Sequence, residues 1–217
     1  TGVSRQRRGG CLMHYRSLNE QTVLTFAALR RRHPGTSFPR EWAGGEIDGI
    51  SYAVIESTPA PDYDPLTEIV SEAAPEQVGG GWRQAWVVSG RALEEVREEL
   101  HARRKAQRTA EEVAGFTYRE HRVDSDRDSI LRITQAAAVA MQALQAGGEH
   151  AVAWTCADGS ELPLDAPGVI GLQQALAAHG AACHARSQAL KAEIEAAETL
   201  TGLAAIDIEA GWPAVGE

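Results

Sequence analysis

The sequence predicts an α+β protein with a small N-terminal β-meander module carrying one helix, a linking helix, and a C-terminal module of β-hairpins and two longer helices. Alternating apolar residues mark the first part as strands, and helical spacing of apolar residues starts the second part. We expect a β-rich docking module at 13–90, a linking helix at 91–113 and a helical and hairpin domain at 114–217.

The N-terminal module contains one helical pattern and three strand patterns. Apolar residues on one side of 21–32 predict a short helix, and 48–57 alternates as a strand does. Three prolines in 58–65 predict an extended connector, because proline cannot donate to a strand ladder. The segments 66–72 and 81–89 are further strands, joined by a loop that contains proline and glycine.

The linking helix begins with Leu93, Val96 and Leu100 at helical spacing. Arg103 and Gln107 stand where that apolar stripe should continue. A stripe that fades after two turns is typical of a helix that bridges domains or is partly exposed.

The C-terminal module starts with a strand or hairpin arm at 116–123 and continues with a helix ended by glycines at 147–148. Alternating runs at 151–164 surround Asp158 and Gly159, a dipeptide that favours a tight hairpin turn with positive φ at both positions. The expected buried stripe of the helix is Ile130, Ile133, Ala137, Met141 and Leu144.

The last helix is the longest, with Asp165 as its expected N-cap and Pro167 in its first turn. About 32 residues at a rise of about 1.5 Å make a rod of about 48 Å. Its apolar and small residues follow a near-heptad rhythm, which predicts a partner helix in the same chain or in another copy. The hypothetical oligomer seam consists of Leu172, Leu176, His179, Cys183, Leu190 and Ile194.

The stretch RVDSDRDSI, residues 122–130, carries the densest cluster of possible chemistry. A calcium loop that opened at Asp124 would need glycine and glutamate where Ser129 and Gln135 stand. Catalytic carboxylates lack a recognisable partner motif nearby. A helix start needs nothing further, since a serine with an acid three residues later forms a capping box. The residues assigned to this cap are Asp124, Ser125, Asp126 and Asp128, with Asp124 or Asp126 as the cap in a shifted register.

His179 and Cys183 are four residues apart, a spacing that can chelate zinc. Without identifiable further ligands, packing in the seam is the favoured interpretation. If copies of the helix associate around a symmetry axis, His179 would make that association sensitive to pH. We therefore predict no catalytic residue, no metal site and no cofactor.

Composition also limits the partners. The net charge is −9, whereas general binding to a nucleic-acid backbone requires clustered cations. The basic stretch at 101–108 is expected to be a solvated helix face, so no nucleic acid is predicted. No apolar run approaches the roughly 18 residues needed to span a bilayer, which predicts no membrane insertion. Residues 1–12 are interpreted as upstream or expression-derived sequence before a natural start at Met13.

Several motifs together resemble a domain of unassigned biochemical function in tailed-bacteriophage tail-fibre and tail-associated proteins. The resemblance covers most of 15–207. It rests on the aspartate-rich helix start, a hairpin with an aromatic residue before Asp-Gly, and the end of the long helix. The matching residues are Asp124, Asp126 and Ser129, then Trp154, Asp158 and Gly159, then Ile194, Ala196, Ala197 and Thr199.

The resemblance implies a structural component of the virion tail, a tail-fibre or baseplate-associated subunit that mediates assembly or docking of fibres. It also implies a homo-oligomer, for which a coiled-coil trimer is one arrangement. Its partners would be fibre, hub or baseplate proteins, with a host surface as a further contact. It would pass through the host cytoplasm during assembly. Two alternatives stay open, a fibre assembly chaperone absent from the virion and a polysaccharide-degrading tail enzyme.

Overall fold

The computed structural model describes residues 13–39 and 41–214. The chain forms two compact units, of which unit 1 ends at Gly90 and unit 2 begins at Arg91. Both helices and strands are present, so the α+β class predicted from the sequence is confirmed. The expectation for residues 1–12 lies outside the described residues.

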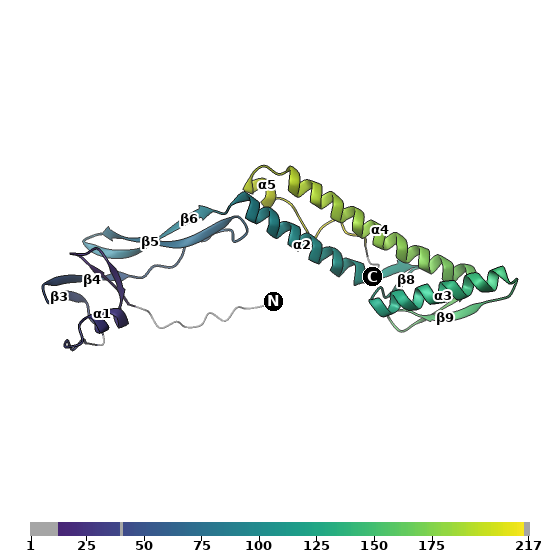
Figure 1. The fold of residues 1–217 in the computed structure, drawn as a ribbon, viewed down its shortest axis with the longest axis horizontal. Helices are drawn as coiled ribbons and strands as arrows, with labels where there is room; N and C mark the ends of the chain where they lie inside the picture. Colours follow the sequence, from purple (N-terminus) through teal and green to yellow (C-terminus); the bar gives the residue numbers. More distant parts are fainter. Residues whose placement is uncertain (1–12, 40, 215–217) are drawn as a thin grey trace. The chain divides into compact units, whose positions relative to one another are not determined.

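Unit 1 is built on a sheet of six strands in the described residues, in the order β2-β1-β4-β6-β5 with β3 paired to β4 (Figure 1). Its elements are β1 (His14–Ser17), β2 (Val23–Thr25), α1 (Phe26–Arg32), β3 (Gly44–Ile47), β4 (Ile50–Glu56), β5 (Glu68–Val78) and β6 (Gly81–Gly90). β4 and β6 run parallel, with Ile55 opposite Trp82. The sheet is therefore not the simple meander that was predicted.

The start of α1 differs from the helix predicted at 21–32. Gln21 has φ of +57°, and the Ser17 N–H donates to the Thr22 carbonyl at 2.8 Å, which closes a tight turn between β1 and β2. Thr25 then caps α1, because its hydroxyl accepts from the Ala28 N–H at 3.2 Å. The apolar residues before Phe26 therefore belong to a strand.

β5 and β6 form a long ribbon, here called the β5–β6 ribbon. The sequence predicted a loop after residue 72, but β5 continues through a bulge between Ala73 and Glu76. The turn is made by Gly79 and Gly80, whose φ values are +60° and +85°. Two successive positive φ angles suit the twist of a two-residue hairpin.

The core of unit 1 is aromatic. Tyr15, Leu29, Phe38 and Tyr52 are buried, and Trp42 packs against them. Tyr52 and Trp42 are two of the large aromatic side chains of this core. Tyr63 is 44% exposed and does not belong to the core.

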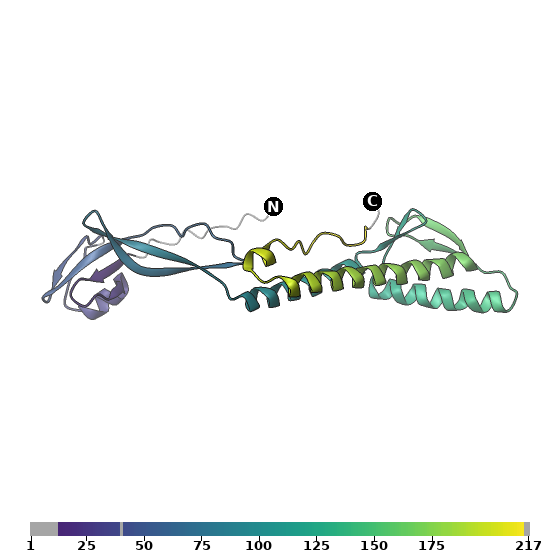
Figure 2. The same ribbon diagram turned by 90° about the horizontal axis from the view of Figure 1, so that it is seen from above.

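Unit 2 is organised around one long helix, α4, which two other helices cover in succession (Figures 1 and 2). α2 packs along its C-terminal half and α3 along its N-terminal half. The elements of unit 2 are α2 (Leu93–Val113), β7 (Phe116–Tyr118), β8 (His121–Val123), α3 (Arg127–Gln145), β9 (Ala151–Thr155), β10 (Glu161–Asp165), α4 (Ala166–Ala196) and α5 (Leu200–Ala204).

The contact of α2 with α4 changes the interpretation of α2 as a linker. Val96 and Leu100 are buried, and Arg104 continues that face with 6% of its surface exposed. The Arg104 guanidinium donates to the carbonyl and the hydroxyl of Ser187 on α4. The basic stretch at 101–108 is therefore not solvated throughout, because its second arginine lies between two helices.

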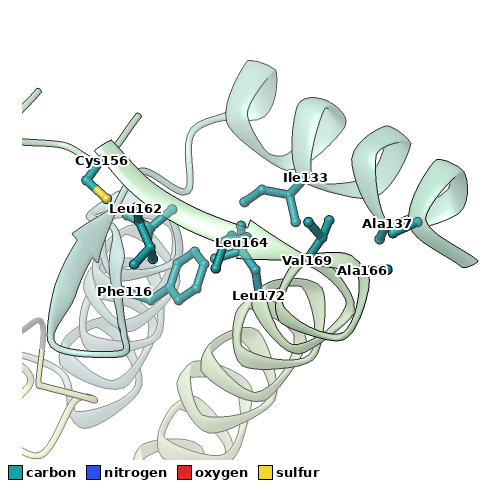
Figure 3. Packing of buried hydrophobic residues seen from close by; sticks show 11 residues of the cluster. Phe116, Ile133, Ala137, Cys156, Leu162, Leu164, Ala166, Val169 and Leu172 are labelled. Atoms are coloured by element: carbon teal, nitrogen blue, oxygen red, sulfur yellow. The ribbon is translucent and has the colours of Figure 1, made fainter. Parts of the chain in front are cut away.

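The main core of unit 2 lies where α3 and the β9–β10 hairpin meet the start of α4 (Figure 3). Asp165 caps α4 as predicted, since its Oδ1 accepts from the Gly168 N–H at 2.8 Å. The hairpin loop differs from the predicted two-residue turn. Gly159 has φ of +80°, Asp158 has no positive φ, and the Cys156 N–H donates to the Ser160 carbonyl at 2.8 Å.

The buried face of α3 differs from the predicted stripe. Ile133 and Ala137 are buried as expected, but Ser129 and Ala140 complete the face. The other predicted members, Ile130, Met141 and Leu144, are 40 to 47% exposed. Close packing through alanines turns the helix so that its larger apolar side chains lie beside the contact and not in it.

Candidate functional site

The aspartate-rich stretch forms a helix terminus. Asp126 is the N-cap of α3, and its Oδ1 accepts from the Asp128 and Ser129 N–H groups at 2.9 and 3.1 Å. Its Oδ2 accepts from the Ser129 hydroxyl at 2.7 Å. This hydroxyl bond, followed by the backbone bonds, lowers the pKa of Asp126 below its usual value. Both carboxylate oxygens thus stabilise the start of the helix.

Ser125 has a different role from the capping one predicted. It is fully buried, its hydroxyl donates to the Glu112 carbonyl at 2.7 Å, and it accepts from the Gly115 N–H at 2.9 Å. These bonds attach the end of α2 to the segment before α3. Asp128 lies in the first turn, where a negative charge favours the positive end of the helix dipole.

Asp124 lies apart from the cap, in a hollow of about 500 Å³ that Arg122 and Asp158 also line. The Ala157 N–H donates to the Arg122 carbonyl at 2.9 Å and joins the β9–β10 loop to β8. Two sequence motifs that are more than 30 residues apart therefore meet at one place. Acidic and basic side chains are mixed there, which does not favour one class of charged ligand.

The predicted seam of α4 is filled within the chain. Leu172, Cys183, Leu190 and Ile194 have no exposed surface, and Leu176 is partly buried against the main core. The partner helices are α2 and α3. Side chains in this position are not available to another copy of the chain.

His179 is a packed member of this seam. Its Nε2 lies 3.0 Å from the Glu111 carbonyl oxygen, and its ring stacks on Phe116 with centroids 6.1 Å apart. A carbonyl only accepts, so Nε2 carries the proton in this contact. Burial raises the pKa of the neighbouring Cys183 thiol. Within the described residues, no group of three or more His, Cys, Asp or Glu side chains could hold a metal ion.

A hydrogen-bonded chain in unit 1 was missed by sequence reasoning. His33 is buried, its Nδ1 lies 2.8 Å from Asp48 Oδ2, and its Nε2 lies 2.9 Å from the Tyr52 hydroxyl. Asp48 and Gly49 form the β3–β4 turn with positive φ, and the Asp-Gly pair was the available signal for it. Burial raises the pKa of Tyr52. This series of hydrogen bonds attaches His33, at the end of α1, to the β3–β4 turn.

Apolar side chains that the chain itself leaves uncovered form two further candidate surfaces, one in each unit. Nine of the 13 large apolar side chains that are exposed in the described residues lie on α3 or on the β5–β6 ribbon. The exposed residues on these elements are Ile130, Leu131, Val139, Met141 and Leu144 on α3, and Ile69, Val78, Val87 and Val88 on the ribbon. Exposed apolar groups concentrated on particular elements are typical of surfaces that contact other proteins.

Residues 95–210 match the model of a family described as "Domain of unknown function (DUF4376)". This stretch begins in α2 and ends beyond α5, so it corresponds to unit 2. No curated protein and no solved structure matches the chain. Among the described residues, no helix combines the length and the apolar character that crossing a bilayer requires.

Proposed function

The chain belongs to the DUF4376 family of domains of unknown function, commonly seen in phage proteins, and from this premise we propose that it is a structural subunit of a bacteriophage tail. In this role it is a fibre or baseplate-associated component that mediates assembly or docking. Its specificity then resides in surfaces and not in a catalytic centre.

The exposed apolar side chains support a docking role most directly. Leu131 and Val139 on α3 are 56% and 51% exposed, although α3 has ample buried surface of its own. A subunit that is covered by neighbours in the finished particle keeps such groups accessible until assembly. The neighbours include other tail proteins and further copies of this chain.

The seam of α4 does not contribute to such an assembly. Its side chains pack within one chain, so we expect any association of copies to use other surfaces, such as the exposed apolar residues of α3 or of the ribbon. The proposed oligomer therefore does not depend on His179.

Mass spectrometry of purified virions tests the proposal. We expect peptides of this chain in a fixed ratio to the known tail subunits of the same particles. The infected-cell lysate serves as the control for expression. Presence in the lysate together with absence from the particle would contradict the structural role and indicate an assembly chaperone.

A further inference from the structure

A hollow of about 490 Å³ with a cationic wall lies between α2 and α4. α2 contributes His101, Arg104, Lys105 and Arg108, and α4 contributes Lys191 and Glu195. Four cationic side chains against two carboxylates, that of Glu195 and that of Glu112, which pairs with Arg108, leave a local excess of two positive charges with neutral histidine. The chain as a whole carries −9, so this concentration of positive charge is opposite to the overall balance.

Arg104 is the one buried cation among the side chains that line the hollow. It is 6% exposed, and its Nη1 donates to the Ser187 carbonyl at 3.0 Å and to the Ser187 hydroxyl at 2.7 Å. Its Nε has no hydrogen-bond partner in residues 13–39 and 41–214. None of the ion pairs formed within those residues includes Arg104. A buried guanidinium without a counter-charge is unfavourable unless an anion approaches it.

The neighbouring groups are also incompletely satisfied. The buried Nδ1 of His101 has no hydrogen-bond partner among the described residues. Arg108 pairs with Glu112 at 3.3 Å and Lys191 with Glu195 at 3.5 Å, whereas Lys105 has no such ion pair in that part of the chain. Spacings of three and four residues place the cations of α2 on one helix face. Two cations without an ion pair in the described residues, Arg104 and Lys105, therefore line the same hollow as the unpartnered Nδ1 of His101.

We propose that the hollow between α2 and α4 binds a small polyvalent oxyanion of the phosphate or sulfate class. Arg104 supplies the buried charge, Lys105 and Lys191 contact the anion from the two helices, and His101 adds a donor. The hollow has room for a short polyphosphate, whose several negative charges suit the several cations better than those of a single phosphate. The site holds α2 to α4, so bound anion also stabilises unit 2. This inference does not depend on the proposed tail function.

The test is isothermal titration calorimetry on the full chain with sodium tripolyphosphate, and separately with inorganic phosphate, at constant ionic strength. We expect one site per chain and tighter binding of tripolyphosphate. Substitution of Arg104 would also break its bonds to Ser187, so the test variant is the double change Lys105→Gln and Lys191→Gln. Both side chains are exposed, and their loss should weaken binding about tenfold while leaving the Tm of the free protein unchanged.

The matched control also removes two positive charges, but outside the hollow. It carries Arg103→Gln and Arg127→Gln, both at exposed positions. Its affinity should equal that of the unaltered chain. Equal weakening in both double variants would overturn the site, because it would show general attraction to positive charge. Absence of binding at millimolar tripolyphosphate would overturn it as well.

A second readout uses His101. Burial first, and then the charge of Arg104, lowers the pKa of His101, while Glu195 opposes this and Lys105 and Lys191 reinforce it. An anion in the hollow would favour the charged imidazole, so sulfate, whose charge is constant between about pH 5 and 8, should bind more tightly as the pH falls. His101→Gln should remove that dependence. A pH dependence that persists in His101→Gln would exclude His101 from the site.

Discussion

Helix α4 and the β5–β6 ribbon are the longest elements of their units, and they place their apolar residues in opposite surroundings. Leu172 and Leu190 on α4 are fully buried, because α2 and α3 cover the seam. Ile69 and Val87 lie on one face of the ribbon and are 47% and 48% exposed. Val88, on the opposite face, is 38% exposed.

The difference follows from how many partners each element has within the chain. β6 pairs with β4 only at its beginning, where Arg83 lies opposite Glu56, and beyond that point it pairs with β5 alone. A two-stranded ribbon is marginally stable in water without a further strand or a packed helix. The seam of α4 is therefore filled within its own chain, whereas the ribbon of unit 1 has no third strand or helix over most of its length and is where an assembly partner would add most.

The largest expected effect is on the seam of α4. Leu190→Ala leaves a cavity between helices, so the free energy of unfolding should fall by about 2–5 kcal/mol. The matched control is Leu131→Ala on α3, which is 56% exposed and should change stability by less than about 0.5 kcal/mol. Urea unfolding followed by far-UV circular dichroism measures both. Similar losses in the two variants would mean that the seam is not filled within one chain.

A smaller effect is expected at the cap of α3. The pKa of Asp126 is lowered in the folded protein, so its carboxylate contributes stability above the pKa of the unfolded chain. That contribution is lost as the pH falls through the lowered folded value. Asp126→Ala should therefore reduce the Tm at pH 7, and the gap from the unaltered protein should close in acid below the usual value of 3.8.

Asp124→Ala is the control for the cap, since Asp124 is exposed and does not accept from the helix start. Thermal melts at neutral and acidic pH compare the two variants. If Asp124→Ala showed the same pH-dependent loss, the stabilisation would come from general negative charge at the helix terminus and not from the cap.

Sequence reasoning succeeded where local chemistry decides the structure. Asp165 caps α4 because a carboxylate before a helical pattern needs only the adjacent backbone, and Asp126 caps α3 in a register considered from the sequence. The spacing of buried residues along α4 also follows from its own sequence. The identity of the helix that covers this seam cannot be predicted in the same way, because a heptad pattern is the same whether the second helix belongs to the same chain or to another copy.

The predictions that failed depend on contacts between distant residues. Arg104 was expected in solvent with the rest of its basic stretch, but Ser187, 83 residues away, provides its acceptors. Ile130 and Met141 were expected to be buried because they follow the same helical spacing as Ile133 and Ala137, but both are exposed. Alanine allows the closer approach of two helices, and hydrophobicity alone does not reveal which face a neighbour will use. The parallel pairing of β4 and β6 also joins segments that are distant in the sequence, with Ile55 opposite Trp82, and local patterns do not predict it.

The smallest effect on folding is expected on the ribbon, where the effect on assembly should be greatest. Val87→Glu places a charge at an exposed position and should change the stability of the isolated chain by less than about 0.5 kcal/mol. A neighbour that covers this face would have to bury an unpaired carboxylate, which opposes binding. We therefore expect the variant to fold normally and to be lost from purified virions, as measured by quantitative mass spectrometry.

The control for the ribbon is Gln77→Glu, which adds the same charge at an exposed polar position of β5. It should be incorporated as the unaltered chain is. Equal incorporation of both variants would show that Val87 stays in solvent in the particle, and the ribbon would then be as complete within one chain as α4 is. Loss of Val87→Glu alone would instead establish that the two long elements differ in where their apolar residues find partners, α4 inside the chain and the ribbon outside it.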